Sequence, residues 1–129
     1  MTDLALLLAA TLFGGMMFFS FGFAPVLFAQ LPIERVRPLL RGTFPHYYRA
    51  IILLSAATAA VAGLVSGPAA LCIAIILVST IYARQVLIGQ INSATDRDDQ
   101  AAFKRLHGLS VVIQLIQIGL AGWAVVLLG

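Results

Sequence analysis

Charged residues are the most conspicuous shortage in this chain. Of its 129 residues, eight are Lys or Arg and five are Asp or Glu. The charged fraction is 10%, against about 25% in a typical soluble protein. Water-soluble enzymes and nucleic-acid-binding proteins need a charged outer surface, which so few residues cannot provide. The net charge of +3 therefore does not indicate a nucleic-acid partner, and the 61% apolar content indicates a protein surrounded by a lipid bilayer.

Cysteine and membrane-embedded carboxylates are also scarce. The single cysteine, Cys72, excludes an intrachain disulfide. No Asp or Glu lies within the long apolar runs, and there is no Ser, His and Asp set, no cysteine pair and no glycine-rich phosphate loop. A proton pump of the usual acidic type is disfavoured, and no group of residues gives a positive reason to expect an enzyme.

Long apolar runs dominate what is present. A first run follows Asp3, and a second, thirty-four residues long, lies between Arg49 and Arg84. As one straight helix the second run would be about 51 Å long, which exceeds the thickness of a bilayer. The Ser-Gly-Pro motif at 66–68 divides it, because Gly ends one helix and Pro begins the next. We predict an all-α integral membrane bundle, one domain with four spans at about residues 4–31, 46–65, 68–91 and 103–128.

The basic residues predict the orientation of this bundle. All eight lie toward the same side of the predicted spans: Arg35, Arg37, Arg41, Arg49, Arg84, Arg97, Lys104 and Arg105. Because basic residues are retained in the cytoplasm, both longer loops are expected to be cytoplasmic and both termini outside, that is, N-out and C-out. A three-span arrangement would divide the basic residues equally between the two sides, which the same rule disfavours. The segment 32–41 is expected to be an interfacial helical turn or a solvated loop.

Polar side chains recur at helical spacing in the last two predicted spans. The fourth span has a row at steps of four and three, made of Phe103, His107, Ser110, Gln114, Gln117 and Ala121. The third span has a corresponding row of Tyr82, Gln85, Gly89 and Asn92. We expect the two rows to face each other, because a polar side chain in hydrocarbon is costly unless it meets another helix or water.

Two interpretations of these rows are open. In the first, the polar groups form hydrogen bonds between helices and hold the bundle together. In the second, they line a cleft that opens to the cytoplasm. The residues of that cleft would be His107, Asn92, Gln85, Ser110 and Gln114, with Tyr47 or Tyr48 at its mouth.

Histidine gives such a cleft its most specific chemistry. His107 is near the expected cytoplasmic boundary, where an imidazole can bind a metal or haem iron or transfer protons. His46 is on the same side, but two histidines alone do not make the usual zinc ligand set. Arg84 either extends to the interface as an anchor or contacts an anion such as a haem propionate. Haem b or a copper-type metal is therefore the cofactor class to consider.

Three stretches resemble a known membrane family. They are Gly15, Phe18, Phe19, Ala24, Pro25, Phe28 and Leu31; Phe44, Pro45 and Tyr47; and Ile91 and Asn92 followed by F-K-R-L-H-G-L-S at 103–110. With them the sequence resembles the transmembrane protein 205-like family, known in bacteria as domain of unknown function 4149. The resemblance implies a four-helix protein of the bacterial inner membrane. It places His107 and Asn92 at recurring family positions, but not His46.

The first of these stretches is also similar to the CopD-like group, which includes copper-resistance proteins and a protoporphyrinogen oxidase that handles haem or porphyrin. Three hypotheses of function follow. The first is an accessory subunit or assembly factor of a larger membrane complex, favoured by short loops and an apolar surface; a homo-oligomer is the alternative assembly. The second is a haem-, porphyrin- or metal-binding protein that uses His107. The third is a small transporter or exporter whose pathway includes Gln114 and Gln117.

Overall fold

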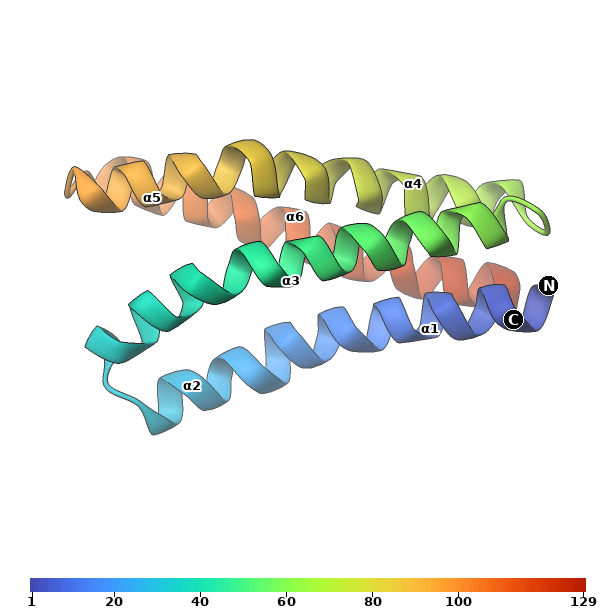
Figure 1. Cartoon of the computed structure of the whole chain (residues 1–129), viewed down its shortest axis with the longest axis horizontal. Helices are drawn as coiled ribbons and strands as arrows, with labels where there is room; N and C mark the ends of the chain where they lie inside the picture. Colours follow the sequence, from blue (N-terminus) through green and yellow to red (C-terminus); the bar gives the residue numbers. More distant parts are fainter.

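Four long helical rods run antiparallel, side by side, in the computed structural model, which describes all residues 1–129 (Figure 1). No strand is present, so the predicted all-α, four-helix architecture is confirmed. In chain order the elements are α1 (Thr2–Phe18), the π-helical η1 (Phe19–Phe23), α2 (Ala24–Gln30), α3 (Ile33–Ala62), α4 (Gly67–Tyr82), the π-helical η2 (Ala83–Leu87), α5 (Ile88–Asp96) and α6 (Gln100–Leu128). The first rod is α1–η1–α2, the second α3, the third α4–η2–α5 and the fourth α6.

Three of the rods are long and apolar enough to cross a membrane: Thr2–Gln30, Gly67–Asp96 and Gln100–Leu128. These three helices make the chain an integral membrane protein. α3 does not reach the same apolarity, because its first half is charged and its charge-free stretch runs only from Ala50 to Ala62. That stretch packs along α4, with Ser55 and Thr58 buried. A fourth crossing by α3 within a single domain therefore stays a prediction.

The turn between α3 and α4 forms at the predicted Ser-Gly-Pro motif, although its residues act differently from our expectation. α3 ends at Ala62 and is followed by Gly63, whereas Gly67 is already the first residue of α4. Ser66 caps α4, because its hydroxyl accepts a hydrogen bond from the Ala69 amide at 3.3 Å. A proline in the first turn of α4 loses no hydrogen bond, since the amides there have no helical partner.

α3 is much longer than the predicted second span. It begins at Ile33, so the segment 32–41 is helical, as one of the two expectations had it, and is not a solvated loop; it forms the start of the long helix. Pro38 and Pro45 lie inside α3 without ending it. A proline leaves the carbonyl four residues earlier without its amide partner, and at the polar end of a membrane bundle water can satisfy that carbonyl.

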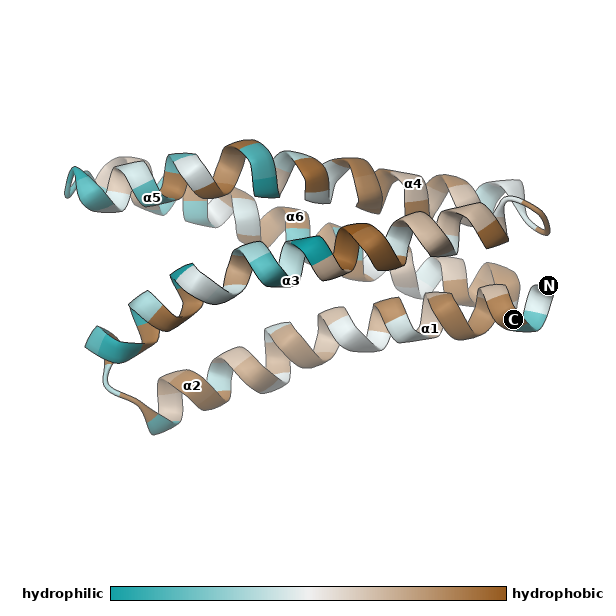
Figure 2. Ribbon diagram, in the orientation of Figure 1, coloured by the Kyte–Doolittle hydropathy of each residue, from teal (hydrophilic) through white to brown (hydrophobic).

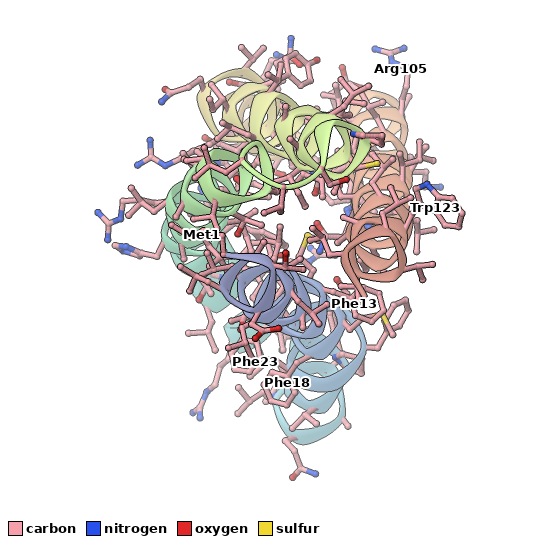
Figure 3. All side chains as sticks on the ribbon, turned by 90° about the vertical axis from the view of Figure 1, so that its right-hand side faces the viewer. Met1, Phe13, Phe18, Phe23, Arg105 and Trp123 are labelled. Carbon is pink, nitrogen blue, oxygen red and sulfur yellow. The ribbon has the colours of Figure 1, made fainter.

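The hydrophobic core occupies the half of the bundle nearest to the chain termini. All four rods contribute to it, through Ala5, Ala9, Leu12, Met16, Ile51, Ala62, Ala69, Ile73, Ile76, Ile118, Ala121, Ala124 and Leu128. Small residues allow close approach of the backbones. A methyl group on Gly122 of α6 would lie 3.1 Å from the ring of Phe13 in α1, which Figure 3 shows next to α6. The core thus combines small alanine side chains with larger aliphatic ones.

The opposite end of the bundle is more open. There α2 packs against η1 and α3 and makes no extensive contact with α6, and Figure 1 shows α2 and the first turns of α3 diverging from α5 and α6.

Beyond the predicted spans, the Arg41 guanidinium donates to both carboxylate oxygens of Asp96, at 2.8 and 3.0 Å. These hydrogen bonds lower the pKa of Asp96. The ion pair is therefore intact at neutral pH and is lost only as the pH falls below the normal range of an aspartate.

Hydrophilic residues gather at this open end and are sparse elsewhere (Figure 2). The predicted orientation, with the 63–66 turn outside and the 97–99 turn in the cytoplasm, can be tested in a Cys72→Ala background. Ser66→Cys should react with a membrane-impermeant thiol reagent in intact cells, and Asp98→Cys should react only after lysis. If α3 does not cross, the two positions exchange sides. Labelling of Asp98→Cys but not of Ser66→Cys in intact cells would therefore contradict four crossings with both termini outside.

Candidate functional site

α6 places two glutamines inside the bundle, one helical turn apart. Gln117 is 3% exposed, and its Nε2 donates hydrogen bonds to Ser79 Oγ at 2.7 Å and to Thr80 Oγ1 at 3.0 Å. Both hydroxyls also donate to the carbonyl oxygen of Ile76 in their own helix. Gln117 therefore links α6 to α4 through groups that are satisfied within α4 as well.

Gln114 links α6 to the first and second rods. Its Nε2 donates to Ser20 Oγ in η1 at 2.9 Å and to Tyr47 Oη in α3 at 2.7 Å. The two glutamines and their partners thus connect all four rods. We call this set the polar layer: Ser20, Tyr47, Ser79, Thr80, Gln114 and Gln117.

An aromatic cluster lies beside the polar layer, between η1 and α3. Its members are Phe19, Phe23, Phe44, Tyr47 and Tyr48. The closest pair is Phe19 and Tyr47, whose ring centroids are 3.9 Å apart in a stacked arrangement. This cluster holds η1 against α3. The next segment, α2, also packs against α3, and it makes no extensive contact with α6. Tyr47 thus belongs to both the aromatic cluster and the polar layer.

The expectation that the two polar rows face each other is wrong for the third rod. Tyr82 is 41% exposed, and Gln85 and Gly89 are also exposed, so this row lies on the outer surface of the bundle. Asn92 is half-buried and has no side-chain hydrogen bond. The interior face of the third rod is apolar instead, with Ser79 and Thr80 supplying its polar contacts to α6. The apolar residues of this interior face are Ile73, Ile76, Ala83 and Leu87.

The predicted histidines lie in separate environments. His107 is exposed and its ring stacks on Phe103, with centroids 5.6 Å apart and an interplanar angle of 4°. Ser110, the next member of the row, donates to the His107 carbonyl oxygen at 2.7 Å. His46 is exposed on α3, where its Nδ1 accepts a hydrogen bond from Arg49 at 3.0 Å. No group of three or more His, Cys, Asp or Glu side chains is close enough to hold a metal ion.

Arg84 has a structural contact that the sequence did not suggest. Its Nε donates to the carbonyl oxygen of Pro45 at 3.2 Å and so links η2 to α3. The residue is half-buried. Arg84 therefore helps to hold the second and third rods together at the level of the aromatic cluster.

Ser20, Ser79 and Thr80 are the polar-layer residues that sequence analysis missed. Ser20 is the only polar side chain between Thr11 and Gln30, which marks it as a residue needing a partner inside the membrane. No comparable signal distinguishes Ser79 and Thr80, because hydroxyl groups can bond to their own helix anywhere.

No buried side-chain nitrogen or oxygen atom lacks a hydrogen-bond partner. The buried polar atoms of the side chains are therefore all paired, and unpaired polar side chains lie only on the outer surface or at the open end. Four antiparallel rods, three of them long and apolar enough to cross a membrane, are joined by internal hydrogen bonds and define a helical integral membrane bundle.

The chain belongs to the family described as Domain of unknown function (DUF4149), which matches residues 7–100. The match covers almost all of the first three rods and ends where α6 begins, so the F-K-R-L-H-G-L-S stretch at 103–110 lies outside it. No curated protein and no solved structure matches the chain. A relationship to transmembrane protein 205-like or CopD-like proteins stays a prediction.

Replacement of Gln117 by leucine should lower the free energy of unfolding by about 1 kcal/mol, the usual size of a hydrogen bond between membrane helices. The loss is small because Ser79 and Thr80 keep their bonds to Ile76. Gln117→Ala should cost about 2 kcal/mol or more, since it also leaves a cavity. Steric-trap unfolding in bicelles measures both variants, and equal losses for the two would contradict this ranking.

Proposed function

We propose that this protein is a non-enzymatic accessory subunit or assembly factor, and that it binds laterally to a transmembrane helix of another membrane protein. The binding surface is the outer face of the third rod, which we call the lateral face: Leu71, Ile75, Val78, Tyr82 and Gln85. The observation that carries this proposal is the outward position of Tyr82 and Gln85 within a predicted span.

The lateral face has the pattern of a helix-packing seam. Its residues follow one another at steps of four, three, four and three, which is the spacing of positions that meet a neighbouring helix. All five are exposed, with Leu71 at 63% and Val78 at 66%. A shallow, open groove lined by α4 alone follows this helix from Leu71 to Tyr82. A second helix could seat its side chains in this groove.

Polarity favours a protein partner over lipid on this face. The Gln85 amide makes no hydrogen bond within the chain, and hydrocarbon cannot provide one. Polar side chains on a neighbouring helix, such as serine, threonine, asparagine or glutamine, can provide this hydrogen bond. Two further features support a protein partner. Every buried polar side-chain atom already has a hydrogen-bond partner, and the turns have only two to four residues. The surfaces left for recognition are therefore the sides of the rods.

Photo-cross-linking from single cysteines tests the lateral face. In a Cys72→Ala background, Val78→Cys carrying a benzophenone should give a heavier adduct with a different polypeptide in native membranes. Leu53→Cys on α3 is the matched control, because Leu53 is also 66% exposed and lies at a similar distance from the α3–α4 turn. It should give no such adduct.

Two results would overturn the proposal. Equal adducts from Val78→Cys and Leu53→Cys would show random contact in the membrane. An adduct of Val78→Cys only with a second copy of this chain would show that the lateral face forms a homo-oligomer.

A second candidate function, binding of haem, porphyrin or a metal, rests on His107. Its exposed ring has no hydrogen-bond partner and is stacked on Phe103, in the first half of α6. An imidazole in this state is free to ligate iron or copper. Transport has less support, since Gln114 and Gln117 are both engaged in hydrogen bonds between helices.

If His107 is a ligand, protein purified from cells supplied with haem and copper should carry a Soret band or stoichiometric metal. His107→Ala should lose that signal without a change in thermal stability, because the ring makes no hydrogen bond in the bundle. His46→Ala serves as the control and should retain it. A blank spectrum and a metal-free wild-type protein would exclude this second function.

A further inference from the structure

A polar groove lies on the outer surface between α5 and α6, next to the lateral face, with which it shares Gln85. One wall is formed by Gln85, Gly89, Gln90 and Ser93, with Arg97 in the following turn and Arg105 on the opposite wall. The groove has a volume of about 600 Å³. It is independent of the glutamines in the polar layer and of His107.

The charges of the groove suit an anion. No acidic residue lines it, and Arg105 forms no ion pair. Arg97 has only a 3.6 Å contact with Asp99, and both of these side chains are about half exposed. Guanidinium groups match phosphate oxygens geometrically, and amide and hydroxyl groups such as Gln90 and Ser93 add further donors.

The position of the groove suits the headgroup region of a bilayer. It begins at Gln85, within the predicted third span, and extends past the end of that span at Ile91 to Arg97. From Gln85 to Arg97 the helix rises by about 18 Å, enough to reach from the hydrocarbon edge through the headgroups. Figure 3 shows Arg105 at the periphery of the bundle, beside α6. The charged end of the groove is thus on the predicted cytoplasmic side.

The groove is open to the outside at Gly89. A Cβ atom added at Gly89 would meet no atom within 4 Å, so a side chain there would project into open space. Val86 and Leu106 provide apolar lining near this position. The groove therefore has room for a glycerol and acyl-chain segment beside Gly89 and phosphate donors at its arginine end.

We propose that this groove binds the phosphate group of an anionic phospholipid from the cytoplasmic leaflet. Arg97 and Arg105 contact the phosphate, and the open space at Gly89 accommodates the adjoining lipid. Basic pockets between helices on the cytoplasmic side are a common setting for such recognition. The proposal goes beyond the accessory role and does not depend on the identity of a protein partner.

Native mass spectrometry of the full chain, released from micelles with equal amounts of phosphatidylglycerol and phosphatidylcholine, tests this site. The wild-type protein should retain phosphatidylglycerol preferentially. The double variant Arg97→Gln/Arg105→Gln should retain about tenfold less, since charge-assisted hydrogen bonds to phosphate are lost. Gly89→Leu should have the same effect by filling the groove. Lys104→Gln, which removes a neighbouring cation outside the groove, should retain as much lipid as wild type.

Competition with inorganic phosphate distinguishes the two sources of the phosphate group. If millimolar phosphate leaves the bound lipid in place, the site recognises the lipid. If phosphate displaces the lipid and Gly89→Leu has no effect, free phosphate is the ligand and the lipid assignment is wrong. Equal retention of the two lipids by wild type, or a loss in Lys104→Gln as large as in the double variant, would overturn the site altogether. Circular dichroism of each variant verifies that the helices are intact.

Discussion

An amide or hydroxyl group inside hydrocarbon has no water to bind, and this requirement organises the centre of the bundle. Gln114 and Gln117 satisfy it through hydroxyl groups of the three other rods. Because these hydrogen bonds have fixed directions, they set the rotation of α6 and of the rods that it contacts. The outward position of Tyr82 and Gln85 is a consequence, since the opposite side of the third rod is the one that meets Gln117.

The two halves of the bundle are held together in different ways. Near the termini, alanine and larger aliphatic side chains form the apolar core. Toward the predicted cytoplasmic end, the rods are joined by specific links: the aromatic cluster, the Arg84 bond to Pro45 and the Arg41–Asp96 ion pair. Exposed polar groups occur at this end too, in the lateral face, at His107 and in the arginine groove. The proposed recognition surfaces thus extend along the outside of the third rod to the predicted cytoplasmic end, whereas the apolar core occupies the half nearest to the termini.

Sequence analysis succeeded where a residue pattern has only one physical solution. A charge-free run in a membrane protein has to be helical, and a thirty-four-residue run has to turn, so the four rods and the turn near Ser66 could be predicted. The start of α3 at Ile33 could not be predicted, because prolines such as Pro38 and Pro45 are ordinarily unfavourable inside a helix. One of the two interpretations of Gln114 and Gln117 was that they form hydrogen bonds between helices, and both side chains form such bonds. Their partners Ser79 and Thr80 were not predicted.

The direction of the third-rod row illustrates why rotation is harder to predict than helix formation. Steps of three and four place Tyr82, Gln85 and Gly89 on one face but do not say what that face meets. Burial of Ile73, Ile76 and Leu87 on the side that meets Gln117 turns the row of Tyr82, Gln85 and Gly89 outward, together with the Gln117 hydrogen bonds. The π-helical segment η2 adds a local change of register immediately after Tyr82, which no residue pattern announced.

The most direct test of the accessory role is the mass of the assembly that contains this chain. Protein extracted from native membranes in a mild detergent, and measured by light scattering with identification of its components, should run as a complex with at least one different polypeptide in fixed ratio. Recovery only as a monomer, or only as an assembly of identical copies, would contradict the central claim.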